Sequence, residues 1–348
     1  MSRPVMWERR VQFTGKSTFV VSLPKEWARR VGLKRGDSVA MVLQPDGSLL
    51  LTPRDVRAMG EPTPITHLIA SSSKSPEEVA REFIGFYLAG WDMIKVKLKD
   101  AGPEHRRHLK DIIRRMLVGV EVLEESAGHL TSQCIIGYAE LPLDRVLRRM
   151  HILSLSMFDD AIQALRTCNP TLAREIVERD DEVDRLYLFA IRELARATRN
   201  PLLIREIGLL SPCDTLDYRL IMKNLERIAD HAVRIARVTP IGEAVAKNVV
   251  ESICGMADRA REVFETAMRS FYRLDTELAH QALREFQDIL DFEDKAEKQI
   301  IKAELSTLSI INLSLVLESV RRIAEYSTDI AEIAINIAAK RFQTNRFG

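Results

Sequence analysis

The sequence has 348 residues, of which 46% are hydrophobic and 29% charged, and its formal net charge is +1. This length suggests two or three domains, and the hydrophobic content is ample for a core. No stretch reaches the roughly 18 uncharged apolar residues of a membrane span, and the first ten residues carry charges where a signal peptide needs an apolar run. We therefore predict a cytoplasmic protein without a membrane span. Four widely spaced cysteines without a CxxC pair argue against a zinc ribbon and agree with a reducing compartment.

The first 56 residues predict short strands, one helical turn and a hairpin. Short apolar runs around Phe13 and Phe19 are separated by a Gly-Lys pair, and Asp46-Gly47 is a hairpin signal. Residues 1–57 contain 11 Lys and Arg against 5 Asp and Glu, a balance of +6, whereas the rest of the chain has a balance of −5. A basic segment on an acidic body suggests a nucleic-acid partner. Strands this short cannot bury a core from one copy, so we predict a homodimer of interlocked copies.

This segment resembles the SpoVT/AbrB-type swapped-hairpin DNA-binding domain over about residues 7–55. The resemblance lies in the Gly-Lys turn, the Leu-Pro-Lys-Glu-Trp segment, the Gly-Leu before Arg-Gly-Asp and the Asp-Gly hairpin. It implies a dimer that binds duplex DNA through basic side chains, although Ala28 stands where the family often has an arginine. Toxin-neutralising relatives share the fold, and the basic residues alone would also solubilise a dimerisation module. The DNA-binding residues that the resemblance implies are Arg9, Arg10, Lys16 and Arg29, with Lys25 and Arg30 as further candidates.

Residues 57–65 contain two prolines and a glycine without periodicity, which marks a linker, and residues 66–140 then mix strand and helix patterns. Ser75, Pro76 and Glu78 have the spacing of an N-cap, a first-turn proline and a capping box. Residues 93–99 alternate apolar residues with lysine, which predicts a half-buried strand. We predict a small α/β domain of unknown role, with strands at 67–70, 93–99, 118–122 and 130–136 and helices that begin after Ser75 and at Pro103.

Two features of this domain have two interpretations each. The lysines of residues 93–99 either touch nucleic acid or, as the favoured interpretation, guard an edge strand. His105 and His108 lie three apart on a predicted helix, so they either ligate a metal or belong to a solvated face. Arg106 and Arg107 lie between them and no acidic cluster accompanies them, which favours the solvated face.

From residue 141 to 341 strand signals disappear and helical periodicity continues. The clearest breaks include Asn169-Pro170 and Pro240-Ile241-Gly242. The apolar face of residues 225–236 recurs 95 residues later in 320–331, which indicates repeats at about 144–240 and 241–341. Tandem amphipathic helices pack as bundles. We predict a multidomain α+β protein: an N-terminal swapped-hairpin β domain, a small α/β middle domain and a C-terminal all-α six-helix bundle of two three-helix repeats.

Carboxylates four residues apart mark a second chemical feature. Asp180 and Asp184 share one predicted helix face, as Glu226 and Asp230 do, and like charges at this spacing destabilise a helix. Either a neighbouring arginine, such as Arg234, or a metal ion would compensate them. Oxygen ligands without cysteine suit a divalent or iron-type ion.

The C-terminal segment resembles the PhoU family, which regulates phosphate uptake, over about residues 144–341. Glu226 and Asp230 match the Glu/Asp-x-x-x-Asp metal motif of that family. In the second repeat Arg321 replaces the first acid of the motif and only Glu325 remains, while a register of Glu293, Asp294 and Glu297 competes with Asp288 and Asp291. The metal ligands that this resemblance nominates are Asp180, Asp181, Asp184, Glu226, Asp230, Asp288, Asp291 and Glu325.

An AbrB-like head on a PhoU-like body resembles archaeal PhoU-type regulators. This resemblance implies a transcriptional regulator of phosphate uptake or metabolism rather than an enzyme. Its partners would be duplex DNA, a second copy, and a phosphate transporter ATPase or signalling protein. The alternative is a PhoU adaptor that acts on such a transporter or a signalling kinase by protein contact, without DNA. An antitoxin-like partner is a third interpretation, and a metal-dependent hydrolase lacks a nucleophile–base pair and a phosphate-cradling glycine loop.

Overall fold

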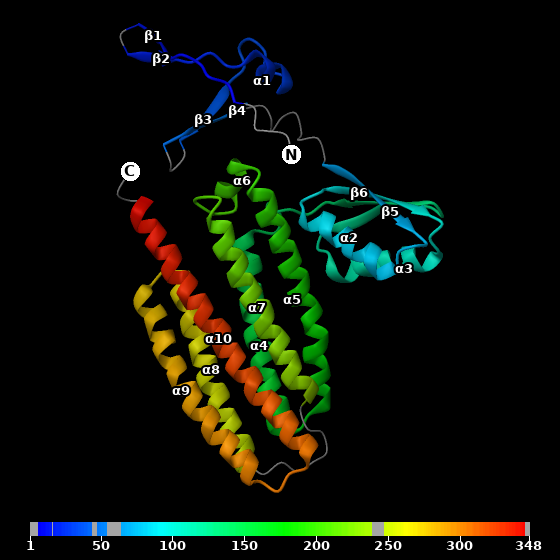
Figure 1. Cartoon of the computed structure of the whole chain (residues 1–348), viewed down its shortest axis with the longest axis vertical. Coiled ribbons are helices and arrows are strands. Elements are labelled where there is room, and N and C mark those ends of the chain that lie inside the picture. Colours follow the sequence, from blue (N-terminus) through cyan, green and yellow to red (C-terminus); the bar gives the residue numbers. More distant parts are fainter. Residues whose placement is uncertain (1–5, 16, 44–46, 54–63, 239–246, 345–348) are drawn as a thin grey trace. The chain divides into compact units, whose positions relative to one another are not determined.

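The computed structural model describes residues 6–15, 17–43, 47–53, 64–238 and 247–344 (Figure 1). Lys16, Asp46, most of the predicted linker and the predicted break at 240–242 lie outside these residues. The chain divides into two compact units, Met1–Thr63 and Pro64–Gly348.

The described part of the first unit consists of two antiparallel pairs of strands and one short helix. Its elements are β1 (Gln12–Thr14), β2 (Thr18–Val20), α1 (Lys25–Arg30), β3 (Val39–Leu43) and β4 (Leu49–Pro53). β1 pairs with β2, and β3 pairs with β4. Gly15 has a φ of 67°, so the turn after β1 uses the left-handed conformation that glycine adopts at no steric cost.

The described residues of a single copy of this first unit form no apolar core. No side chain in its described part is buried. Phe13 and Phe19 pack edge to face with ring centroids 5.1 Å apart, yet their exposed fractions are 58% and 73%. The short strands therefore leave large apolar side chains in water, as expected for strands of this length.

The second unit begins with an α/β domain built on one mixed sheet. Its elements are β5 (Ile65–Ser71), α2 (Pro76–Leu88), β6 (Met93–Lys99), α3 (Pro103–Met116), β7 (Val120–Glu125) and β8 (His129–Cys134). The strand order is β5-β6-β8-β7, in which β5 and β6 are parallel and the other pairs antiparallel. Helices α2 and α3 pack on one face of the sheet (Figure 1), where Phe83, Val96 and Leu109 are buried. The predicted capping box of Ser75 and Glu78 is confirmed.

Two favoured interpretations of this domain are wrong. Residues 93–99 form a strand as predicted, but β6 lies between β5 and β8 and is not an edge strand. Its lysines therefore guard no edge. His105 is not on a solvated face either: it is 5% exposed, and its Nε2 lies 2.8 Å from the carbonyl oxygen of Lys74. Its ring joins the start of α3 to the loop before α2.

Helices make up the rest of the described chain. They are α4 (Leu143–Thr167), α5 (Pro170–Ala197), α6 (Pro201–Glu206), α7 (Asp214–Val238), α8 (Lys247–Arg273), α9 (Thr276–Lys302) and α10 (Thr307–Thr344). Helices α4, α5 and α7 contact one another, as α8, α9 and α10 do, and α7 also packs on α10. Ala229 and Ala232 of α7 and the corresponding Ala324 and Ser327 of α10 are buried, so the recurring face lies in the core of both sets. No helix among the described residues is long and apolar enough to cross a membrane.

Candidate nucleic-acid interface and carboxylate cluster

Five of the six predicted DNA-binding residues are described, and all five are exposed. Among the described residues, none of these five side chains has an ion-pair partner, and Arg9 only donates a hydrogen bond to the carbonyl oxygen of Glu8 at 3.4 Å. Their positive charges therefore face water and are available to an anionic partner. These residues are Arg9 and Arg10, which precede β1, and Lys25, Arg29 and Arg30 of α1; Lys16 lies outside the described residues.

The backbone around α1 fixes how this short helix presents its charges. The N–H of Ala28 donates to the carbonyl oxygen of Pro24 at 2.9 Å. At the other end of the helix, the N–H of Leu33 donates to the carbonyl oxygen of Ala28 at 2.9 Å. Gly32, with a φ of 69°, makes that reversal without a side-chain clash. Trp27 and Ala28 are half-buried, whereas the basic residues of the same helix, Lys25, Arg29 and Arg30, are exposed.

Four of the predicted metal ligands repel one another across α5 and α7. Burial and the neighbouring carboxylates, Asp184 first among them, raise the pKa of Asp180 to about 7. Burial and the charges of Glu226 and Asp230 raise the pKa of Asp184 to about 6, and burial and Glu226 raise the pKa of Asp230 as well. Oδ1 of Asp180 is buried and has no hydrogen-bond partner in the described part of the chain. The cluster therefore accumulates negative charge that its neighbours only partly compensate.

Lys223 supplies part of the compensating charge. Its ammonium lies 2.6 Å from Oε1 of Glu226, which is 9% exposed, and 5.2 Å from the ring centroid of Tyr187. This pair was not predicted from the sequence, although an i,i+3 spacing on one helix indicates such contacts. The ion pair of Arg234 with Asp230 is not formed, because Arg234 pairs with Glu318 of α10 at 3.1 Å.

The donors of this cluster do not form a ready metal site. Throughout the described ranges, no three His, Cys, Asp or Glu side chains lie close enough together to hold an ion. Asp181 is directed elsewhere, because it pairs with Arg115 of α3 at 2.7 Å. The carboxylate oxygens are suitable ligands for a divalent cation, but Lys223 would have to leave Glu226 and the side chains would have to converge.

The second repeat holds an ion-pair network at the corresponding place. The guanidinium of Arg321 lies 3.1 Å from Glu293 and also pairs with Glu325, which accepts from Arg322 at 2.9 Å. The α9 acid that pairs with Arg321 is thus Glu293, from the competing register. The predicted α9 ligands, Asp288 and Asp291, are exposed.

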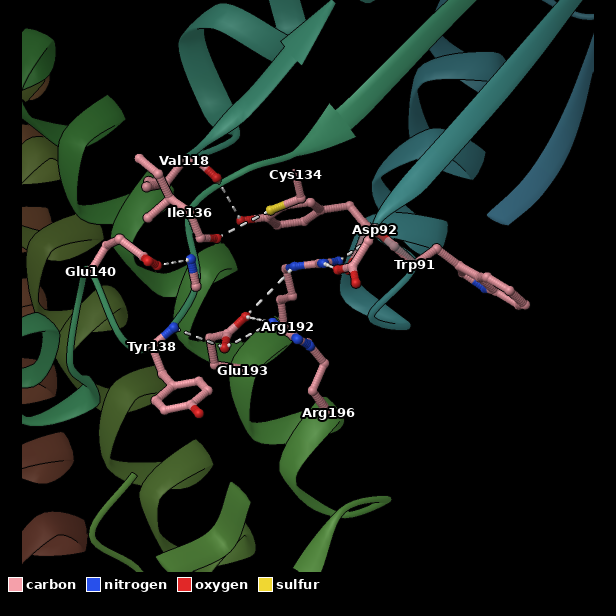
Figure 2. Close-up of polar contacts among 12 residues, drawn as sticks. Trp91, Asp92, Val118, Cys134, Ile136, Tyr138, Glu140, Arg192, Glu193 and Arg196 are labelled. Atoms are coloured by element: carbon pink, nitrogen blue, oxygen red, sulfur yellow. Dashed lines mark hydrogen bonds and ion pairs between the residues drawn. The ribbon is translucent and has the colours of Figure 1, made fainter. Parts of the chain in front are cut away.

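A polar cluster that the sequence did not indicate joins the α/β domain to α5 (Figure 2). Arg192 is fully buried, donates to the carbonyl oxygens of Tyr87 and Trp91 at 2.8 Å each, and pairs with Asp92. Glu193 is also buried and accepts a hydrogen bond from the backbone N–H of Tyr138 at 3.3 Å. The cluster therefore ties the connection between α2 and β6, and the segment that follows β8, to the same turn of α5.

Long packed helices, an α/β domain attached to α5 and a basic hairpin unit define a helical-bundle protein with added modules. The PhoU domain family matches residues 147–239 and 253–334, half of the chain, and the chain belongs to the PhoU family. A second family, described as antidote-toxin recognition MazE, bacterial antitoxin, matches residues 12–58.

Known proteins and a solved structure are similar to part of this chain. Phosphate-specific transport system accessory protein PhoU homolog 1 of Thermotoga maritima is 27% identical over 203 residues, which cover 54% of this chain and 82% of that protein. The PhoU homolog of Rhizobium meliloti is 32% identical over 113 residues, or 31% of this chain and 45% of that protein. The crystal structure of PhoU from Pseudomonas aeruginosa has 21% identity and a TM-score of 0.48, and covers 57% of this chain and 96% of that one.

Proposed function

We propose that this PhoU-family chain is a DNA-binding regulator of phosphate uptake. The names of its relatives, accessory proteins of phosphate-specific transport, support the phosphate part of the proposal. The DNA part is carried by one observation: the unit that matches the MazE family presents its basic side chains exposed and without ion-pair partners in its described part. Free cationic groups on a dimerisation module are suited to the phosphates of a duplex.

In this proposal the first unit acts as a homodimer. Phe13, Phe19 and Met41 expose 58%, 73% and 68% of their surface in one copy. Interlocking two copies would remove these side chains from water and create the core that one copy lacks. It would also double the number of arginines and lysines that face one DNA segment.

The helical body transmits the signal in this proposal, as a six-helix bundle of two three-helix repeats. The first repeat would bind a divalent cation through Asp180, Asp184, Glu226 and Asp230, because an ion would relieve the repulsion that, together with burial, raises the pKa values of the three aspartates. The second repeat neutralises its acids with Arg321 and would not bind one. A phosphate transporter ATPase or a signalling protein is the partner proposed for the body.

One observation favours a second candidate function, that of an adaptor without DNA binding. The family matched by residues 12–58 is described by recognition of a protein toxin, so the same unit could serve protein recognition. Such an adaptor would bind its partner through the same exposed apolar and basic side chains. Its association with DNA would be absent even at low salt.

Binding of a fluorescent mixed-sequence duplex by the full chain, titrated with salt, separates the two. Each phosphate contact contributes about −0.9 to the log–log salt slope, so Arg9→Ala with Arg10→Ala should reduce the slope by about 2 and weaken binding to all sequences. Arg174→Ala with Arg284→Ala, two exposed arginines of the bundle, is the charge-matched control and should leave the slope unchanged. No binding by the wild type at low salt would favour the adaptor.

A further inference from the structure

The open face of the α/β sheet carries a row of lysines. Lys95, Lys97 and Lys99 alternate along β6 with residues that pack toward α2 and α3, of which Ile94 and Val96 are 3% and 1% exposed. Successive side chains of a strand point to opposite faces. The three lysines therefore lie on the face away from the two helices, and all three are exposed.

The central position of β6 places this row in the middle of the face. On β5, His67 lies beside Lys95 and Ile69 beside Lys97 in the parallel register. On β8, His129 lies beside Lys97. Lysines that protect a sheet from pairing belong on its edges, and no edge is protected here. The row therefore needs another explanation.

Local pairing does not neutralise these charges. Among the described residues, none of the three ammonium groups makes a hydrogen bond or an ion pair. Other lysines of the same domain do, since Lys110 pairs with Glu125 at 2.7 Å. The nearest strand that carries acids on the open face is β7, and β8 separates β7 from β6. On β7, Glu124 accepts a hydrogen bond from Thr131 of β8 at 3.5 Å.

The spacing of the row matches an extended polyanion. Residues two apart on a strand are about 6.6 Å apart, so the row spans about 13 Å. One strand of duplex DNA carries a phosphate about every 3.4 Å along the axis, so this length covers about four phosphates. A second copy of the chain is a poor occupant, because an isologous contact through this face would bring two lysine rows together.

We propose that this open sheet face, centred on Lys95, Lys97 and Lys99, is a second surface that binds the phosphate backbone of duplex DNA. The proposal extends the DNA binding proposed for residues 1–57 and gives the α/β domain a role. Contacts of this kind position a protein on DNA without reading sequence. The face would therefore add affinity and salt dependence to the complex, and leave sequence preference to the first unit.

The test uses the full chain and the same fluorescent duplex. Lys95→Gln, Lys97→Gln and Lys99→Gln together should reduce the salt slope by about 2.7 and weaken binding about tenfold or more at physiological salt. The corresponding triple Lys→Arg variant should keep the wild-type slope. Lys295→Gln, Lys298→Gln and Lys302→Gln, exposed lysines of α9, form a control with the same change in net charge and should have little effect. All variants should melt like the wild type, because the substituted side chains are exposed.

The outcomes separate this proposal from that for the first unit. An unchanged slope in the β6 variant, with a reduced slope in the Arg9 and Arg10 variant, would overturn only the sheet-face proposal. The reverse pattern would overturn the role of the first unit and support the sheet face. An equal loss in the α9 control would show a general net-charge effect and overturn the sheet face. Loss of binding to anionic phospholipid vesicles with an unchanged DNA slope would assign the face to a lipid surface instead, and a wild type that binds no duplex would overturn both proposals.

Discussion

Arg192 of α5 forms an ion pair with Asp92, which immediately precedes β6, across the seam between the helical bundle and the α/β domain (Figure 2). The arginine side chain is fully buried, whereas that of Asp92 is 22% exposed. The guanidinium also lies 4.9 Å from the ring centroid of Tyr87. A charge in this position is tolerable only while its partners stay in place, so the end of α2, the start of β6 and α5 should hold together as one unit.

Arg192→Ala should therefore destabilise the protein strongly. Removing one partner of a buried pair costs about 3–5 kcal/mol, and here it also leaves the carbonyl oxygens of Tyr87 and Trp91 without their donor. Urea denaturation followed by circular dichroism measures the free energy of unfolding. Arg174→Ala, at an exposed position of the same helix, should change it by less than about 0.5 kcal/mol. A loss below about 1 kcal/mol in Arg192→Ala would show that the seam does not depend on this side chain.

Local sequence signals predicted much of the α/β domain and the helical body. Ser75 and Glu78 cap α2 because an N-cap and an acid three residues later satisfy backbone donors within one turn, whatever the rest of the chain does. Alternation predicted β6 over the same residues that the structure assigns to it. The position of β6 within the sheet was not predictable in this way, because strand order depends on pairing with β5 and β8 and not on local pattern.

The side-chain partners of the candidate site were predicted less well. Arg192 lies in an amphipathic helix, where a charged residue usually faces water, and only the docking of the α/β domain buries it. The family resemblance nominates Asp181 as a metal ligand beside Asp184, but in the structure Asp181 pairs with Arg115 of α3. Sequence spacing shows which residues share a helix face, and it contains no information on what an adjoining domain places against that face.

Stability should decrease as the pH rises through the titration of Asp180 and Asp184. Their pKa values in the folded protein are about 7 and about 6, whereas an unfolded aspartate has a pKa of about 3.9. Between about pH 4 and pH 7 the folded state thus holds more protons, and the free energy of unfolding falls with rising pH. Asp180→Asn should weaken this dependence and melt higher than wild type at pH 8 in chelator, but not at pH 4.5. Glu178→Gln, at an exposed position of α5, should shift the melting temperature equally at both pH values. An equal shift at both pH values in Asp180→Asn would contradict a raised pKa of Asp180 in the folded protein.

A divalent cation should stabilise the wild type through the carboxylates of the first repeat. A ligand of the folded state adds about 2.7 kcal/mol at a hundredfold excess over its dissociation constant. Asp184→Asn with Asp230→Asn should abolish this gain. In chelator the same variant should melt no lower than wild type, because repulsion is relieved and the Lys223–Glu226 pair is kept. Thermal melts with manganese or magnesium measure both effects.

Glu293→Gln with Glu325→Gln in the second repeat is the control and should keep the wild-type response to the cation. An undiminished gain in the first-repeat variant would show that the cluster binds no metal.

Phe19→Ser should dissociate the full-length dimer. In one copy this side chain is 73% exposed and contacts Phe13, so a strictly monomeric protein would tolerate the substitution. In an interlocked dimer the phenylalanine is buried in both copies, and each burial contributes about 1.5–3 kcal/mol. The two burials together contribute about 3–6 kcal/mol, so the dissociation constant should rise by about a hundredfold or more, since 1.4 kcal/mol corresponds to a factor of about ten. Sedimentation velocity over a concentration series measures the shift.

The control is Ile301→Ser, at a position of α9 that is 76% exposed, and it should leave the dimer intact. A wild type that sediments as a monomer, or a dimer that Phe19→Ser does not weaken, would contradict the assignment of this surface to the dimer core.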